Sequence, residues 1–309
     1  MSAPADQRGA PPPAGPPDLA LEAPAKVNLF LEIFARRPDG YHEIETVMQT
    51  VDLADQVSFW RRPAGEWTIS ISGGEAPADQ SNLALRAAAA ILKQSGRREG
   101  LHLHIAKHIP TGAGLGGGSS DAAAALRGLN QLWKLGARPA DLESLGAALG
   151  SDVNFFLHGG LAVCRGRGEE VEPLAASCPA GFVLHFPGLH LATREAYARV
   201  RIPLTGERRT CNNLLERLRR DDLKGAGREL FNRFEETVLD DNPRLAAAKE
   251  RLSSSRALGA LLSGSGSTIY ALAAPGDLDG LTRELSKTLR RESLRPVRPV
   301  GSWGPGSAV

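Results

Sequence analysis

The spacing of apolar side chains predicts mainly strands in the first third of the chain. Residues 26–33 alternate apolar and polar side chains as a half-buried strand does, and Lys26 and Asn28 then share one face. The further strands expected in this part lie around residues 46–53, 56–60, 67–71 and 101–105. Apolar side chains that recur about every 3.6 residues predict a helix over residues 82–94.

Helical patterns predominate in the rest of the chain. The helices expected here lie around residues 122–135, 139–149, 193–200, 214–219, 225–238, 243–253 and 278–291. The strands expected between them lie around residues 160–165, 182–186 and 268–273. This mixture predicts an α+β protein of two lobes, with a nucleotide bound between them.

Both ends of the chain are poor in core-forming side chains. Residues 1–18 are rich in proline and predict a disordered leader, and residues 301–309 predict a flexible tail. The folded part is therefore expected within residues 19–300, which are long enough for two lobes with buried cores.

Composition and charge exclude several classes of function. The net charge is only +2 and the arginines are scattered, so no nucleic-acid partner is expected. No apolar run approaches the roughly 18 residues of a membrane-spanning helix, and no secretory signal is visible, so neither a membrane partner nor export is expected. The three cysteines lack metal-ligand spacing and indicate reduced thiols in a cytoplasmic protein. Nothing in the sequence specifies an oligomeric state.

A glycine-rich segment separates the strand expected at residues 101–105 from the helix expected at residues 122–135. Its residues are Pro110, Thr111, Gly112, Ala113, Gly114, Leu115, Gly116, Gly117, Gly118, Ser119 and Ser120. The glycines let the backbone adopt positive φ and approach a ligand closely, and Ser119, Ser120 and Asp121 favour a helix N-terminus. Because a helix N-terminus favours an anion, the segment predicts a cradle for a nucleotide triphosphate.

Other phosphate-binding loops have different requirements. A Walker loop ends in Gly-Lys-Ser/Thr, whereas Gly118 is followed by Ser119. The dinucleotide fingerprint fits Gly112, Gly114 and Gly117, but no second βαβ unit with an acidic residue about 20 positions further on supports it. A glycine-rich turn without a ligand is the bland alternative.

The loop sequence Pro-x-Gly-Ala-Gly-Leu-Gly-Gly-Gly-Ser-Ser resembles the signature of the GHMP kinase superfamily. Residues 23–29 and 262–268 resemble the other two motifs of that superfamily, in the same order. The resemblance implies a two-lobed GHMP-kinase-like fold with the nucleotide and substrate sites between the lobes. Residues 19–175 would form the N-terminal ATP-binding domain and residues 176–300 the C-terminal domain. It also implies ATP and Mg²⁺ as cofactors and a small molecule as phosphate acceptor.

Three further segments, residues 37–44, 149–156 and 166–169, resemble one family within the superfamily. Its members phosphorylate the 2-hydroxyl of 4-diphosphocytidyl-2-C-methyl-D-erythritol in non-mevalonate isoprenoid precursor synthesis, and the resemblance implies this activity. The alternatives are a GHMP kinase of the homoserine or mevalonate type and a catalytically silent nucleotide-binding sensor.

The resemblance also implies which residues act at the reacting centre. Asp152 is the candidate base for the acceptor hydroxyl, and Lys26 is the cation that would stabilise the developing negative charge. Asn28, on the same strand face as Lys26, would contact the acceptor. Without the resemblance, Asp152 reads as a helix cap, Lys26 as a solvated strand lysine and Asn28 as a structural amide.

The remaining candidates concern substrate and metal. The resemblance implies that Tyr41 and His42 hold the cytidine and that Thr193 and Asn154 also reach the substrate. The alternative for Tyr41 and His42 is an ordinary β-turn, and a helix N-cap explains Thr193 equally well. Mg²⁺ would arrive on the triphosphate, with Ser120 as a possible contact, and no protein metal ligand is assigned. Asp121 would cap its helix or approach the metal, and residues 263–268 would close round the phosphates.

Overall fold

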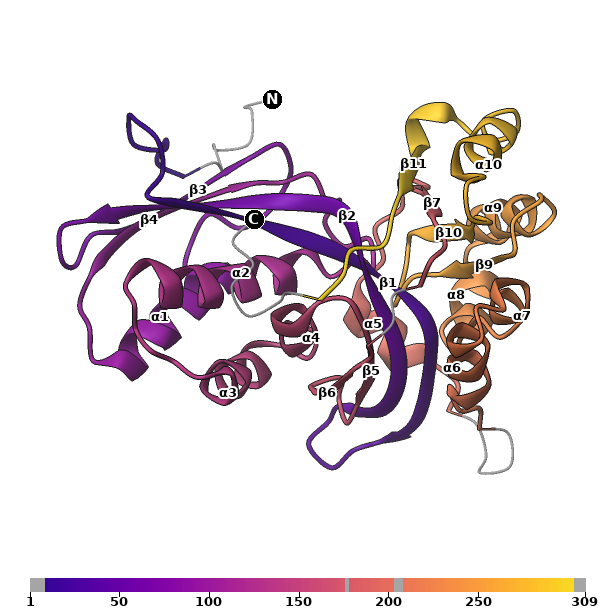
Figure 1. Cartoon of the computed structure of the whole chain (residues 1–309), viewed down its shortest axis with the longest axis horizontal. Coiled ribbons are helices and arrows are strands. Elements are labelled where there is room, and N and C mark those ends of the chain that lie inside the picture. Colours follow the sequence, from indigo (N-terminus) through magenta and orange to yellow (C-terminus); the bar gives the residue numbers. More distant parts are fainter. Residues whose placement is uncertain (1–8, 176–177, 203–207, 303–309) are drawn as a thin grey trace.

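The computed structural model of the chain describes residues 9–175, 178–202 and 208–302. These residues form two lobes that lie side by side, each built on one sheet with helices packed against it (Figure 1). The expected two-lobed α+β architecture is therefore confirmed. None of the helices in the described residues is long and apolar enough to cross a membrane.

The first lobe is organised by a long antiparallel hairpin of two strands, β1 (Leu19–Arg36) and β2 (His42–Arg62). Gly40 lies in the turn between them with φ +86°, a conformation that glycine adopts without strain. The smaller strands of this sheet are β3 (Trp67–Ser72), β4 (Gly100–Ala106), β5 (Leu161–Arg165), β6 (Glu170–Pro173) and β8 (Phe231–Asn232). The order is β3-β4-β2-β1-β8, and β5 pairs with both β2 and β6.

Four helices cover one face of this sheet (Figure 1): α1 (Leu83–Ser95), α2 (Gly117–Leu132), α3 (Pro139–Leu149) and α4 (Val153–His158). The alanines at positions 122–125 let α2 pack closely against the sheet and α1. Gly128 lies so near the Phe59 ring that a Cβ atom there would be 2.5 Å from it. This close packing holds α2 against β2.

The second lobe is built on a four-stranded sheet of order β11-β7-β10-β9. Its strands are β7 (Phe182–His185), β9 (Gly259–Leu262), β10 (Ile269–Leu272) and β11 (Leu294–Val297), the last preceded by the short 3₁₀ helix Arg291–Ser293. Its helices are α5 (Thr193–Arg199), α6 (Asn212–Arg219), α7 (Leu223–Arg228), α8 (Glu235–Asp241), α9 (Pro243–Ser253) and α10 (Leu278–Leu285). Helices α9 and α10 cover one face of the sheet. The other face shares a core with β1 and α6.

Two segments from the second half of the chain join the lobes. Strand β8 pairs with β1, and the buried Glu32 of β1 forms an ion pair of 2.7 Å with Arg233, which follows β8. After β11 the chain returns to the first lobe, where the Val300 N–H donates to the Thr50 carbonyl oxygen at 2.9 Å. The division near residue 175 stays a prediction, because segments from beyond it complete the first lobe.

The predicted leader and tail lie partly outside the described residues, which exclude residues 1–8 and 303–309. Residues 10–18 contain neither helix nor strand, but contacts link this segment to the sheet. The Asp18 N–H donates to the Phe59 carbonyl oxygen at 2.8 Å, and the Trp60 indole donates to the Gly15 carbonyl oxygen at 3.3 Å.

Several predicted elements are wrong in extent. The helix expected over residues 225–238 is two helices separated by β8, because the Asn232 amide donates to the Leu262 and Gly264 carbonyl oxygens, both at 2.8 Å. The helix expected over residues 278–291 ends at Leu285, and the chain continues to β11 at the edge of the second sheet. The two strands expected over residues 46–60 are one strand, β2, and α4, β6, β9 and β11 were not expected.

Candidate active site

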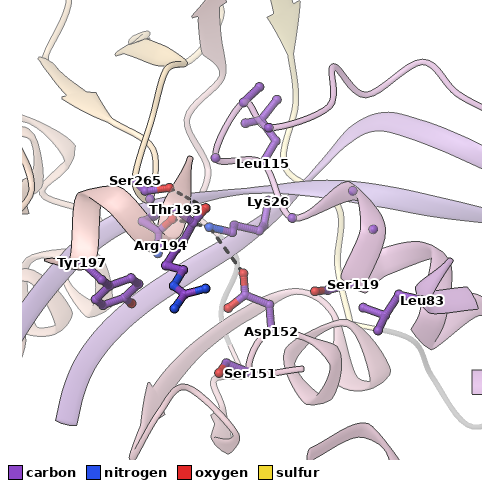
Figure 2. Close-up of a pocket in the computed structure, with 18 of the residues that line it drawn as sticks. Lys26, Leu83, Leu115, Ser119, Ser151, Asp152, Thr193, Arg194, Tyr197 and Ser265 are labelled. Atoms are coloured by element: carbon purple, nitrogen blue, oxygen red, sulfur yellow. Dashed lines mark hydrogen bonds and ion pairs between the residues drawn. The ribbon is translucent and has the colours of Figure 1, made fainter. Parts of the chain in front are cut away.

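A pocket of about 1190 Å³ lies between the two lobes. The first lobe contributes the start of β2, the glycine-rich loop and the segment before α4, and the second lobe contributes α5 and residues 264–265. Figure 2 shows Lys26, Asp152, Thr193, Arg194 and Tyr197 pointing into this space. The pocket therefore gathers residues from all three superfamily-like motifs.

The glycine-rich loop adopts a conformation that requires glycine. Gly112, Gly114 and Gly116 have φ of +66°, +76° and +73°. A Cβ atom at Gly114 would lie 2.1 Å from the Ser263 carbonyl oxygen, and one at Gly116 would lie 2.7 Å from the Phe156 ring. The loop is thus a closely packed backbone surface that faces the pocket.

Helix α2 begins at Gly117, two residues before the serines that were expected to start it. Ser119 consequently lines the pocket, whereas Ser120 falls on the buried face with a hydroxyl that has no hydrogen-bond partner among the described residues. The structure therefore does not place Ser120 where it was expected to meet Mg²⁺. The first N–H groups of α2 remain at the pocket wall, and these are the groups that favour an anion.

The second lobe holds the loop in place through hydrogen bonds. The Ser263 hydroxyl donates to the Gly114 carbonyl oxygen at 3.0 Å, and the Thr268 N–H donates to the Ala113 carbonyl oxygen at 3.2 Å. From the first lobe, the Lys26 N–H donates to the Leu115 carbonyl oxygen at 3.0 Å. Residues 263–268 are therefore bonded directly to the glycine-rich loop, and their closure round bound phosphates stays a prediction.

A buried cluster of three charges lies beneath the loop. The Lys107 ammonium donates to Asp55 and, at 2.7 Å, to Asp121. Asp55 also accepts the backbone N–H groups of His108 and Ile109, at 2.6 and 2.8 Å. Asp121 therefore pairs with Lys107, and the expectation that it caps α2 is wrong.

The cluster contains two carboxylates and one ammonium. Burial raises the pKa of Asp121 to about 7, with the Asp55 carboxylate adding to the effect and Lys107 opposing it. Burial lowers the pKa of Lys107, but the two carboxylates outweigh it and the net direction is upward. Lys107 thus stays charged while Asp121 readily binds a proton.

Lys26 and Asp152 face each other across the pocket. The Lys26 Nζ lies 3.7 Å from Asp152 Oδ2 and donates to Asn28 Oδ1 at 2.6 Å. The Asn28 amide in turn donates to the Thr46 hydroxyl at 2.8 Å, and that hydroxyl donates to the Phe30 carbonyl oxygen at 2.6 Å. Lys26 is therefore held by a chain of side-chain hydrogen bonds that extends into the sheet.

The bland alternatives for this pair are wrong. Lys26 is only 4% exposed, so it is not a solvated strand lysine. Asp152 precedes α4, but its side chain makes no capping hydrogen bond and is partly exposed to the pocket (Figure 2). Burial lowers the pKa of Lys26 and Asp152 partly offsets this, so the carboxylate favours the charged form of the lysine.

Aromatic side chains line the part of the pocket beside the β1–β2 turn and α5. The His42 ring stacks on Tyr197 with centroids 4.9 Å apart, and the Arg167 guanidinium lies 4.8 Å from the centre of the Tyr41 ring. Burial lowers the pKa of His42, and nearby Arg36 lowers it further. Tyr41 is 52% exposed, an unusual exposure for a large ring. The two predicted residues thus form a platform, to which the structure adds Tyr197.

Thr193 and Asn154 have different surroundings. Thr193 lines the pocket and its hydroxyl hydrogen-bonds the Ser265 hydroxyl at 3.0 Å, while Ala192 is the N-cap of α5, so the N-cap alternative for Thr193 is wrong. Asn154 does not line the pocket, and its side-chain amide donates to the Glu169 carbonyl oxygen at 3.1 Å. The structure thus separates Asn154 from the other predicted substrate residues.

No preformed metal cage is evident in the part of the chain that the structure describes, since no group of three or more His, Cys, Asp or Glu side chains could hold an ion. Four lining residues that the sequence reasoning missed are Lys107, Arg167, Arg194 and Tyr197. Of these, Arg167 lies in a segment that already carried the family resemblance, and Tyr197 lies on the predicted helix of residues 193–200.

Comparisons with known proteins found relatives that cover most of the chain. Residues 82–160 match the GHMP kinases N terminal domain, and residues 214–291 match the GHMP kinases C terminal domain. The 4-diphosphocytidyl-2-C-methyl-D-erythritol kinase of Brevibacillus brevis is 42% identical over 82% of this chain and 87% of its own length. That of Shouchella clausii is 41% identical over 82% of this chain and 85% of its own.

Solved structures give the same result. A crystal structure of 4-(cytidine 5'-diphospho)-2C-methyl-D-erythritol kinase has a TM-score of 0.75 and 35% identity, and the match covers 92% of this chain and 99% of that one. Homoserine kinase from Cytophaga hutchinsonii has a TM-score of 0.74 at 20% identity, covering 95% of this chain and 97% of that one, which shows a shared fold alone. The chain belongs to the 4-diphosphocytidyl-2-C-methyl-D-erythritol kinase family of the GHMP kinases.

Proposed function

We propose that this chain transfers the γ-phosphoryl group of ATP to the 2-hydroxyl of 4-diphosphocytidyl-2-C-methyl-D-erythritol, a step of non-mevalonate isoprenoid precursor synthesis. The observation that carries the proposal is the Lys26–Asp152 pair, which lies in the same pocket as the glycine-rich loop and the aromatic platform. We include a cytoplasmic location and Mg²⁺ dependence in the proposal.

ATP would bind with its triphosphate along the glycine-rich loop. The start of α2 supplies N–H groups and a positive helix end, and the glycines leave the backbone accessible. The pocket continues from the loop past Ala76, Pro77 and Leu83, an apolar stretch suited to the adenine ring. Mg²⁺ would be held by phosphate oxygens and water and would screen the triphosphate charge, because the described residues offer no ligand cluster of their own.

The oxygen of the acceptor hydroxyl would bond to the γ-phosphorus while the bond between that phosphorus and the ADP oxygen breaks. Asp152 would accept the proton that this hydroxyl loses. Lys26 would stabilise the negative charge that develops on the attacking oxygen. The hydrogen bond from Lys26 to Asn28 fixes the ammonium, so we assign Asn28 a positioning role in addition to any contact with the acceptor.

The cytosine ring would stack at the platform formed by Tyr41, His42 and Tyr197. Stacking of a base on an aromatic side chain contributes about 1–3 kcal/mol in single-strand binders. Neutral His42 can donate one hydrogen bond and accept another, as recognition of a cytosine edge requires. Thr193, between the platform and Ser265, would contact the sugar alcohol or its phosphates.

Replacement of Asp152 by asparagine tests the mechanism. The substitution preserves shape but removes the base, so with the cytidyl substrate kcat should fall by about 100-fold or more. ATP affinity, measured by calorimetry, should change little. Lys26→Met should also lower kcat with a smaller effect on ATP affinity. Near-normal kcat in Asp152→Asn would refute the role of the base, and loss of ATP affinity alone in Lys26→Met would move Lys26 to the phosphate cradle.

A further inference from the structure

The charges that line the pocket are not balanced. The cationic side chains are Lys26, Arg36, Lys107, Arg167 and Arg194, and the carboxylates are Asp121 and Asp152. Three of the cations have carboxylate partners: Lys26 faces Asp152, Lys107 lies between Asp55 and Asp121, and Arg167 pairs with Glu169 at 3.0 Å. Among the described residues, the side chains of Arg36 and Arg194 have neither a hydrogen bond nor an ion pair.

The two unpaired arginines lie in different parts of the pocket. Arg36 ends β1 beside the turn that carries Tyr41, and it is close enough to His42 to lower the pKa of that imidazole. It therefore belongs to the aromatic end. Arg194 lies in the first turn of α5 and points into the pocket toward the side of Asp152 (Figure 2).

The register of α5 places Arg194 between the aromatic platform and the reacting centre. Thr193, one residue earlier, bonds to Ser265 beside the glycine-rich loop. Tyr197, one helical turn later, stacks on His42. The Arg194 side chain emerges between these two contacts, and in Figure 2 it extends between Tyr197 and Asp152.

We propose that Arg194 binds the diphosphate of the acceptor substrate. This inference rests on the proposed function: the acceptor joins cytidine to a sugar alcohol through a diphosphate, which must span from the platform to Asp152. A guanidinium binds phosphate oxygens through two parallel hydrogen bonds and remains charged at any physiological pH. Arg194 would therefore distinguish a diphosphate-linked acceptor from a small uncharged alcohol.

Binding of two simple probes isolates the effect. Cytidine carries the base and ribose alone, whereas cytidine diphosphate adds the phosphates. In Arg194→Ala, affinity for cytidine diphosphate, measured by calorimetry, should fall by about 10- to 100-fold, the loss expected for hydrogen bonds to a charged group. Affinity for cytidine should stay within about twofold. With the full acceptor, KM should rise while kcat and the KM for ATP change little.

Arg199→Ala is the matched control, because Arg199 lies on the same helix, pairs with Asp241 at 2.8 Å and does not line the pocket. It should leave both affinities unchanged. Three results would each overturn the assignment. In Arg194→Ala these are equal losses of affinity for cytidine and cytidine diphosphate, or a drop in kcat without loss of affinity for cytidine diphosphate. The third is a selective loss of affinity for cytidine diphosphate in Arg36→Ala but not in Arg194→Ala. Failure of the unaltered protein to bind cytidine diphosphate and to use the acceptor would instead refute the proposed function.

Discussion

Replacing Lys107 by methionine removes the ammonium that lies between Asp55 and Asp121. Both carboxylates are almost wholly buried, with side chains 0% and 4% exposed. Removing one partner from a buried ion pair costs about 3–5 kcal/mol, because the remaining charge stays buried without compensation. At about 2–4 °C per kcal/mol for a domain of 150–250 residues, the melting temperature at pH 8 should fall by roughly 6–20 °C.

The pH dependence of this loss has a defined sign. The folded pKa of Asp121 is raised to about 7, above the ordinary value of 3.8 for an aspartate, so the folded state binds this proton more tightly than the unfolded state. Its contribution to stability is therefore greatest at low pH and declines as the pH rises toward 7. Because Lys107 opposes the rise in the pKa of Asp121, removing Lys107 should make that carboxylate favour protonation more strongly, so the stability deficit of Lys107→Met should shrink between pH 8 and pH 5.5.

Asp121→Asn is the matched control. It removes one carboxylate but keeps the pair between Lys107 and Asp55, so it should cost much less than Lys107→Met at pH 8 and should flatten the dependence of stability on pH. The measurement is thermal unfolding of the three proteins at pH 5.5 and pH 8. An unaltered melting temperature in Lys107→Met, or a larger loss in Asp121→Asn, would refute the reasoning.

Three further predictions concern the pocket. In Gly114→Ala the new Cβ atom would lie 2.1 Å from the Ser263 carbonyl oxygen, on a residue with φ +76°, so KM for ATP should rise at least about tenfold. The control Gly118→Ala, which has open space at its Cβ, should change this KM little, and similar KM values in both variants would contradict a tight loop. Burial, and to a lesser extent the nearby Arg36, lowers the pKa of His42 below 6.5, so the imidazole is neutral at pH 7. KM for the acceptor should therefore stay constant above pH 6.5 and rise only below it, and a rise that begins at pH 7.5 would contradict a neutral role. Asn154→Ala should change KM for the acceptor less than about twofold while lowering the melting temperature, because its amide donates to a partly buried backbone carbonyl instead of lining the pocket. A tenfold KM increase would restore it as a substrate residue.

Much of the site could be predicted because its signals are local. The glycines of the loop specify a backbone conformation within a few residues, and the structure shows positive φ at Gly112, Gly114 and Gly116. Likewise the two-residue period of a strand is enough to place Lys26 and Asn28 on one face, where they form a hydrogen bond.

The remainder depends on contacts between distant segments. Asp55 and Lys107 are 52 positions apart, and the ion pair exists only because β2 and β4 are neighbours in the sheet. Asn154 shows a second kind of failure, since two residues after Asp152 the short helix α4 has turned its side chain away from the pocket. The break at Asn232 is a third, because hydrogen bonds to the second lobe override a helical pattern.

The central claim is that the pocket transfers phosphate from ATP to a cytidine diphosphate-linked alcohol. It is tested most directly by ADP release from the purified protein with ATP and Mg²⁺, with 4-diphosphocytidyl-2-C-methyl-D-erythritol, homoserine, mevalonate and phosphomevalonate as parallel acceptors. The account predicts turnover with the cytidyl acceptor alone. Turnover with another acceptor instead, or with none of the four, would contradict it.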